Sequence, residues 1–155
     1  MATLSNIVKL TKAQYTTLLN GGSITSGGVT YYYDANTFYL IDNEWAYERN
    51  AISSSFFVRY RYVDNNILVH VHFYNYGTIS SIPYTVISNL DSTLRPQVTM
   101  RGSVTGDISS NTGRYPVNVD INPDGTIKLY PIFPSQYSGS CTAMYIFGDV
   151  YYYVN

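Results

Sequence analysis

The order of apolar and polar residues predicts one short helix near the start of the chain. Thr11 is followed three residues later by Gln14, which is the spacing of a capping box. Gly21 supplies a left-handed stop, so we expect a helix over residues 12–20. Its apolar stripe is formed by Tyr15, Leu18 and Leu19.

Short strand-like segments separated by turn residues fill the rest of the chain. We expect the segments 29–33 and 37–41 to form one hairpin, and the segments 140–147 and 150–154 to form another around Gly148 and Asp149. The region 89–95 reads as a polar loop before Pro96. This spacing predicts an all-β fold, an antiparallel β-sandwich of the jelly-roll type. The other expected strands are 7–10, 45–49, 56–63, 67–74, 78–88, 97–104, 115–121 and 126–132.

The helix and the first hairpin set residues 1–44 apart from the strands that follow. We therefore expect an N-terminal attachment or oligomerisation segment at 1–44 and a β-sandwich domain at 45–155. The glycine-rich stretch 21–28 has no Gly-Lys-Ser/Thr ending and reads as a connector, not as a phosphate-binding loop.

The composition excludes several classes of protein. Hydrophobic residues make up 45% of the 155 residues and charged residues only 12%, which is too apolar for a disordered chain. No apolar run approaches the ~18 residues that span a membrane. The net charge of -1 provides no basic surface, so we expect no nucleic acid as a partner. We expect no membrane as a partner either. No leader of basic and apolar residues opens the chain, so we expect no secretion signal. The lone Cys141 cannot form an intrachain disulfide, and no cofactor is expected.

Tyrosine is in large excess, with eighteen copies against a single tryptophan. The triplets 31–33 and 151–153 place rings on both faces of their strands, because side chains alternate along a strand. We expect both faces to be covered, either by the core or by a neighbouring copy of the chain. Direct contact of some rings with a ligand is the alternative.

Arg59 and Arg61 fall on the same face of one expected strand. Two guanidinium groups at this spacing are suited to clamping a phosphate or a carboxylate. The simpler alternative is a pair of cross-strand ion pairs on a solvated face.

His70 and His72 share one face of the segment 67–74, whose other face is apolar. Both rings project the same way and could ligate a metal, for example at a contact between subunits. Because no cysteine or carboxylate stands beside them in sequence, we expect ordinary polar residues of a sheet and no metal.

The sequence gives little support for catalysis. Glu44 and Glu48 are the only glutamates, and no second motif points at them. Cys141 on an expected strand reads as a buried thiol. We therefore expect no enzyme.

Two stretches of the chain, each made of two parts, resemble segments of tailed-bacteriophage structural proteins. Residues 9–15 (KLTKAQY) and 31–42 (YYYDANTFYLID) resemble a segment common in such proteins. Residues 90–96 (LDSTLRP) and 119–127 (VDINPDGTI) are similar to the tip domains of tail fibres and baseplate receptor-binding proteins. Asp91 and Leu94 stand here where proline and tyrosine are usual in those tips.

The resemblance implies a virion fibre, baseplate or head-fibre protein, usually trimeric, whose β-sandwich tip meets the host surface. We therefore expect a homotrimer that binds cell-surface polysaccharide and attaches to other virion proteins through its N-terminal segment. The alternative is a head-fibre or decoration protein with a structural role alone. The residues that we expect to face the ligand are Arg59, Arg61, Tyr74 and Tyr76.

Overall fold

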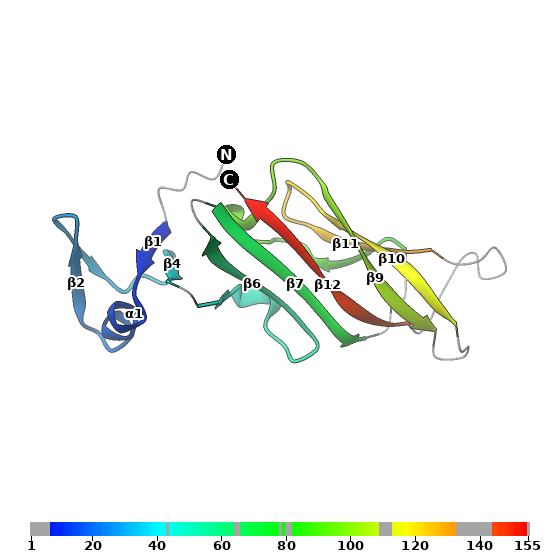
Figure 1. Cartoon of the computed structure of the whole chain (residues 1–155), viewed down its shortest axis with the longest axis horizontal. Coiled ribbons are helices and arrows are strands. Elements are labelled where there is room, and N and C mark those ends of the chain that lie inside the picture. The colour runs from blue at the N-terminus through cyan, green and yellow to red at the C-terminus, as the bar shows by residue number, and fades with distance from the viewer. Residues whose placement is uncertain are drawn as a thin grey trace.

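The chain is an all-β protein with a single α-helix among the residues that the structure describes (Figure 1). The computed structural model describes residues 7–42, 44–63, 66–77, 79, 82–108, 113–132 and 144–154. In these ranges no helix is long and apolar enough to cross a membrane. A small N-terminal lobe lies at one end of a large sheet (Figure 1).

The large sheet has eight strands in the order β5-β6-β7-β12-β9-β10-β11-β8, and every neighbouring pair is antiparallel. The last strand of the chain, β12, lies in the middle of the sheet between β7 and β9. The strands are β5 (Ala46–Tyr47), β6 (Phe56–Val63), β7 (Asn66–Tyr76), β8 (Tyr84–Ile87), β9 (Met100–Ile108), β10 (Arg114–Ile121), β11 (Ile127–Pro131) and β12 (Met144–Val154). A 3-10 turn, η2 (Arg49–Ala51), lies between β5 and β6, and a second, η3 (Ser92–Leu94), lies between β8 and β9.

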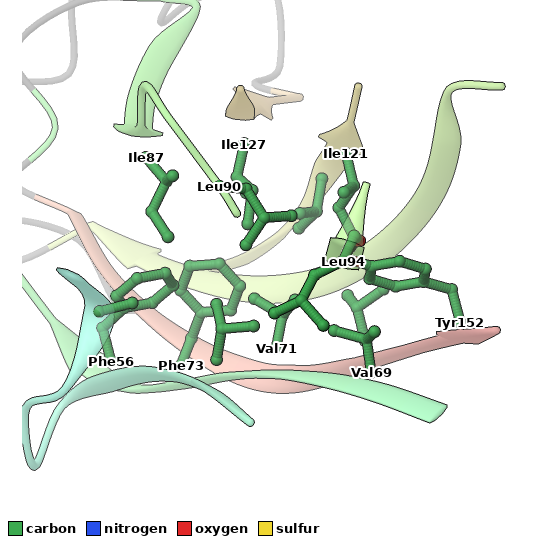
Figure 2. Packing of buried hydrophobic residues seen from close by; sticks show 14 of the residues in the cluster. Phe56, Val69, Val71, Phe73, Ile87, Leu90, Leu94, Ile121, Ile127 and Tyr152 are labelled. Atoms are coloured by element: carbon green, nitrogen blue, oxygen red, sulfur yellow. Dashed lines mark hydrogen bonds between the residues drawn. The ribbon is translucent and has the colours of Figure 1, made fainter. Parts of the chain in front are cut away.

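The sheet curls so that its two ends face each other across one hydrophobic core. Figure 2 shows Val71 and Phe73 of β7 pointing toward Ile87 and Ile127, which come from the other end of the sheet. The alternation expected for residues 67–74 is confirmed, since Ile67, Val69, Val71 and Phe73 are all buried. The all-β expectation is therefore confirmed, in the form of one curled sheet.

The segment 89–95 before Pro96 is largely buried against the core and is not the polar loop that the sequence suggested. Leu90 and Leu94 are fully buried and point into the core (Figure 2). The hydroxyl of Tyr152 donates to the Leu94 carbonyl over 2.7 Å, and the Leu90 amide donates to Gly125. Polar side chains of this segment form hydrogen bonds with its backbone: Asp91 accepts from the Thr93 amide, and Arg95 donates to the Leu90 carbonyl. The backbone can therefore be buried together with the two leucines.

The N-terminal lobe combines a parallel strand pair, the helix and a hairpin. Strand β1 (Ile7–Leu10) pairs in parallel with β4 (Phe38–Ile41), while β2 (Ser23–Ser26) pairs with β3 (Val29–Tyr32). The lobe has its own buried cluster of Leu10, Leu18, Ile24 and Tyr39. Leu40 belongs instead to the core of the large sheet, so β4 joins the two parts. The division at residue 44 stays a prediction.

The helix α1 (Lys12–Leu19) begins and ends as expected. The Thr11 side chain accepts from the Gln14 amide and the Gln14 side chain accepts from the Thr11 amide, which confirms the capping box. Gly21 adopts a φ of 81° and ends the helix. Leu18 is buried whereas Leu19 is 53% exposed, so only part of the expected stripe packs inside the chain.

The expected hairpin between residues 29–33 and 37–41 is wrong. Gly27 and Gly28 both have positive φ and make a tight turn, so β3 turns back on β2. The stretch read as a connector therefore contains a strand and a turn. Asp34 holds a separate turn by accepting from the Asn36 amide, and the chain then runs alongside β1.

The expected hairpin around Gly148 and Asp149 is also wrong, because β12 runs through both residues without a turn. Gly148 has a φ of 143° and lies against Val104 of β9. It serves close packing between strands, one of the two usual reasons for glycine inside a strand. Cys141 lies outside the described residues.

Candidate functional site

One side of the sheet, opposite the core, collects aromatic and charged side chains from β5, β6, β7 and β12. We call this surface the outer face. Tyr74, Tyr151 and Tyr153 are 62%, 55% and 54% exposed, although they stand on a rigid sheet. The strand registers place on the outer face Tyr47, Phe57, Arg59, Arg61, Leu68, His70, His72, Tyr74, Phe147, Asp149, Tyr151 and Tyr153.

Trp45 brings the two expected arginines together. The guanidinium carbons of Arg59 and Arg61 lie 4.3 Å and 4.8 Å from the centre of the indole ring. Such cation–π contacts hold a guanidinium over the ring and do not use its N–H donors. Nε of Arg61 is buried and has no hydrogen-bond partner among the described residues. In the described part of the chain, neither arginine forms an ion pair with a carboxylate. The alternative of cross-strand ion pairs is therefore not what these residues make.

Arg59 is held by a histidine instead. Its Nε donates to Nδ1 of His70 over 2.8 Å. Arginine has no acceptor, so Nδ1 of His70 carries the lone pair and Nε2 carries the proton. His70 Nε2 then donates to Oδ1 of Asp149 over 2.6 Å, and Nδ1 of His72 lies 2.8 Å from the same oxygen.

The surroundings of this group favour a neutral imidazole beside a charged carboxylate. His70 is 3% exposed, and burial lowers its pKa despite the nearby Asp149. Burial alone would raise the pKa of Asp149, but the hydrogen bonds from His72 and His70 outweigh it and leave the pKa below its usual value. The rings of Tyr151 and Phe57 stack on His70 and His72 at 4.3 Å and 4.5 Å.

Three of the four residues expected to face a ligand share the outer face, and Tyr76 does not. Asn75 adopts a φ of 50°, and the register between β7 and β12 shifts at this point. This bulge turns Tyr76 to the core side, where its ring contacts Phe56 and Phe73. Burial raises the pKa of Tyr76 to about 12. Tyr74, one position before the bulge, stays on the outer face.

A cavity of about 460 Å³ opens beside the outer face, where the lobe meets β5. Trp45 and Tyr47 line it and also contact outer-face residues, namely His70 and Phe57. Trp45 and Tyr47 therefore belong to the cavity and also contact the outer face, whereas Ala46 and Tyr60 line the cavity from the core side of the sheet. The aromatic residues that line the cavity are Tyr15, Tyr39, Trp45, Tyr47 and Tyr60.

Polar groups share this cavity with the rings. Glu48 is 5% exposed, and its carboxylate accepts from the Asn50 amide at the start of η2. Burial raises the pKa of Glu48 above its usual value, and Asp91, which lines the same cavity, adds to the effect. Glu44 is not a lining residue and pairs with Lys12 over 2.8 Å. The two glutamates therefore do not meet in one site.

The two tyrosine triplets are covered only in part within the chain. In the second triplet Tyr152 is 3% exposed, whereas its neighbours Tyr151 and Tyr153 remain half exposed. In the first, Tyr32 is 68% exposed and Tyr33 stacks on Tyr39. The expectation that neighbouring chains cover the exposed rings stays a prediction.

Sequence reasoning missed Trp45 and Asp149. Trp45 is the only tryptophan and stands on a different expected strand from Arg59 and Arg61, so nothing local linked it to them. Asp149 was read as a turn residue, although it alternates with Tyr151 and Tyr153 as one strand face requires. That alternation was the available signal.

No protein-family model and no curated protein matches the chain. The function is therefore inferred from the cavity and the outer face.

Proposed function

We propose that this chain binds host cell-surface polysaccharide as a homotrimeric fibre or baseplate protein of a bacteriophage virion. The observation that carries the proposal is the aromatic cavity that continues through Trp45 and Tyr47 onto the outer face. Aromatic rings cover the apolar faces of sugar rings, and polar groups such as Glu48 and Asp91 accept from sugar hydroxyls. Glu48 and Asp91 cap the turns η2 and η3 and are held there by backbone amides, so these groups are in place without a ligand.

The arginine pair suggests that the polysaccharide is anionic. Arg59 and Arg61 make no ion pair with a carboxylate in the described ranges, and both guanidinium groups lie over the ring of Trp45. A phosphate or carboxylate group along the polymer would supply the missing counter-charge. Tyr74, 62% exposed on the same face, offers a further ring at a distance from the cavity.

Three linked copies would make weak single sites sufficient, because linkage raises the effective concentration of the second and third contacts. In this proposal the lobe attaches the chain to other virion proteins, and the curled sheet serves as a jelly-roll-like sandwich tip. The protein acts by binding and performs no catalysis.

Binding of the purified protein to cell-wall polysaccharide tests the proposal. We expect Trp45→Ala to abolish co-sedimentation with an anionic wall polymer, because it removes a cavity wall and releases both arginines. Tyr32→Ala is the matched control, since this tyrosine is 68% exposed on β3 and lines neither the cavity nor the outer face. Circular dichroism must show that both variants are folded. Equal binding by Trp45→Ala, or no binding of the wild type to any wall fraction, would contradict the proposal.

A purely structural role is the alternative, as a head-fibre or decoration protein. It is favoured by the exposure of Tyr32 and Val29 on β3, neither of which lines the cavity, because large exposed apolar side chains often mark protein contacts. Labelling intact virions with antibody separates the two roles. A capsid location together with no wall binding would favour the structural one.

A further inference from the structure

His70, His72 and Asp149 form a cluster that the proposed function does not use. One ligand atom from each residue lies within 4.8 Å of the others. We propose that this cluster binds a divalent transition-metal ion of the Zn²⁺ class, and that binding releases Arg59 from His70. The sequence favours no metal here because no carboxylate stands beside the two histidines in the chain, and the structure supplies one in Asp149.

The strands themselves place the three ligands. His70 and His72 are two positions apart on β7, so their rings leave the sheet on the same side. Asp149 lies directly opposite His72 on β12, while Tyr151 lies opposite His70. Both strands are in the middle of the sheet, where the backbone is held on both sides. The ligands therefore do not depend on a loop to come together.

The donor set selects the kind of metal. Two imidazole nitrogens and one carboxylate oxygen suit Zn²⁺ and similar first-row ions, whereas Ca²⁺ and Mg²⁺ prefer oxygen ligands alone. Asp149 and His72 keep side-chain exposures of 44% and 25%, so an ion has a path from solvent. A fourth position on that side is open to water or to a ligand of the outer face.

The present distances require only a small rearrangement. His70 Nε2 and His72 Nδ1 lie 2.6 Å and 2.8 Å from Asp149 Oδ1, which are hydrogen-bond lengths. Ligands at about 2.0–2.2 Å from a tetrahedral ion lie roughly 3.3 Å from one another. Each histidine nitrogen must therefore move away from Asp149 by less than about 1 Å, while the two histidine nitrogens, which lie within 4.8 Å of each other, must approach to about the same separation. Side-chain rotation can supply both shifts.

Arg59 opposes the metal in a specific way. A metal on Nε2 of His70 displaces the proton there, and the neutral ring must then carry its proton on Nδ1. In the metal-free structure His70 Nδ1 accepts from Arg59 Nε. Once Nδ1 carries a proton, both atoms are donors and this hydrogen bond cannot form. Ligating histidines usually donate their second N–H to an acceptor. Metal binding therefore requires Arg59 to leave His70 while it stays near Trp45, so the ion and the arginine pair are coupled.

Zinc titration of the untagged, chelator-treated protein by calorimetry tests the site. We expect one Zn²⁺ per chain for the wild type and at least about tenfold weaker binding for His72→Ala and for Asp149→Asn. Cys141→Ser should bind as the wild type does, which excludes the thiol. Absence of wild-type binding, or unchanged affinity in His72→Ala and Asp149→Asn, would overturn the proposal.

Arg59→Gln tests the coupling. Glutamine Oε1 stands as many bonds from the backbone as arginine Nε, so it can accept from His70 Nδ1 in the metal-bound tautomer. We expect this variant to bind Zn²⁺ up to about tenfold more tightly than the wild type. Arg61→Gln is the control, because it removes the same charge from the same face without touching His70. If the two variants tighten binding equally, simple charge repulsion suffices and the proposed release of Arg59 fails.

The imidazole nitrogens give an independent readout. His70 and His72 are the only two histidines of the chain, so a long-range ¹H–¹⁵N spectrum contains their signals alone. Without metal we expect His70 as the Nε2–H tautomer, and with Zn²⁺ we expect His70 as the Nδ1–H tautomer. If the signals of either histidine do not change when one equivalent of Zn²⁺ is added, the proposed metal site is wrong, whatever the outcome of the polysaccharide assay.

Discussion

Two glycines on neighbouring strands allow β9 and β12 to pack closely in the middle of the sheet. A Cβ on Gly102 would lie 2.6 Å from Val150 Cγ2, and a Cβ on Gly148 would lie 2.9 Å from Val104 Cβ. The valine of one strand thus fills the space over the glycine of the other. On its other side β12 pairs with β7, where Asp149 and Tyr151 lie opposite His72 and His70.

Gly148→Ala should destabilise the protein by about 2–4 kcal/mol, since both a strained φ and overpacking contribute. Its φ is 143°, and the Val104 backbone and side chain leave no room for a methyl group. Urea unfolding monitored by circular dichroism measures the change. Gly28→Ala is the control, because it has a φ of 78° but nothing within 4 Å of the new Cβ. Equal effects of the two substitutions would show that packing against Val104 does not matter.

Asp120 and Arg101 form a bidentate ion pair across β9 and β10, with distances of 2.7 Å and 2.9 Å. The hydrogen bonds from Arg101 lower the pKa of Asp120 below its usual value of 3.8. The folded state therefore holds this proton less tightly than the unfolded state does. The stability that the pair contributes is present above pH 3.8 and is lost as the pH falls through the folded pKa.

Asp120→Asn should lower the free energy of unfolding by about 1–2 kcal/mol at pH 7, with a smaller difference from wild type near pH 3. Denaturant unfolding at the two pH values measures this. Asp107→Asn is the matched control, because Asp107 pairs with Arg114 on the same two strands at 3.5 Å and with more exposure. A control that loses as much stability would contradict a special role for the buried carboxylate.

Among the elements, α1 depends on its cap more than on its packing. Leu18 is its only buried residue, and the cap bonds the first-turn amide of Gln14 to Thr11. Thr11→Ala should therefore destabilise the helix by about 1 kcal/mol. Hydrogen exchange of the α1 amides measures the change, and the amides of β7 should keep their protection. Thr16→Ala, which removes only a bond to the Lys12 carbonyl, should have little effect. Faster exchange throughout β7 would show that the lobe and the sheet unfold together.

Elements specified by neighbouring residues could be predicted from the sequence, whereas strand partners could not. The helix with its capping box and the strand at 114–121 depend on short-range signals, and both were found close to their bounds. The pairing of β1 with β4 and the insertion of β12 between β7 and β9 depend on packing between residues far apart in the chain. Glycine was the main source of error. Gly27 and Gly28 make a turn inside a stretch read as a connector, and Gly148 makes none inside a stretch read as a hairpin.

The candidate site shows the same limit at the scale of the whole molecule. Arg59, Arg61, His70 and His72 were found because alternation places each pair on one face of its own strand. Trp45 contacts the arginines and Asp149 contacts the histidines from distant parts of the chain, so no local spacing in the sequence indicated either contact. The bulge at Asn75 likewise moved Tyr76 to the core side after an otherwise regular strand.

The exposed tyrosines of β12 lead to a prediction about assembly. Tyr151 and Tyr153 are more than half exposed at the centre of a sheet, although such positions are usually covered. Phenol rings bury apolar area and keep the hydroxyl hydrogen-bonded, which suits contacts between subunits. Trp45 and the cavity lie at the β5 end of the sheet, so neighbouring chains can cover β12 while a ligand occupies the cavity.

We expect light scattering after gel filtration to give three times the chain mass of 17.5 kDa. Replacing both Tyr151 and Tyr153 by serine should shift the protein toward the monomer. Val98→Ser, which changes a 68% exposed residue outside the outer face and both tyrosine triplets, should leave the mass unchanged. Tyr151 also stacks on His70, so the single variant Tyr153→Ser separates loss of the contact between chains from a disturbed outer face. A wild-type mass of 17.5 kDa would mean that these rings meet water or a ligand instead, and the trimer would have to be abandoned.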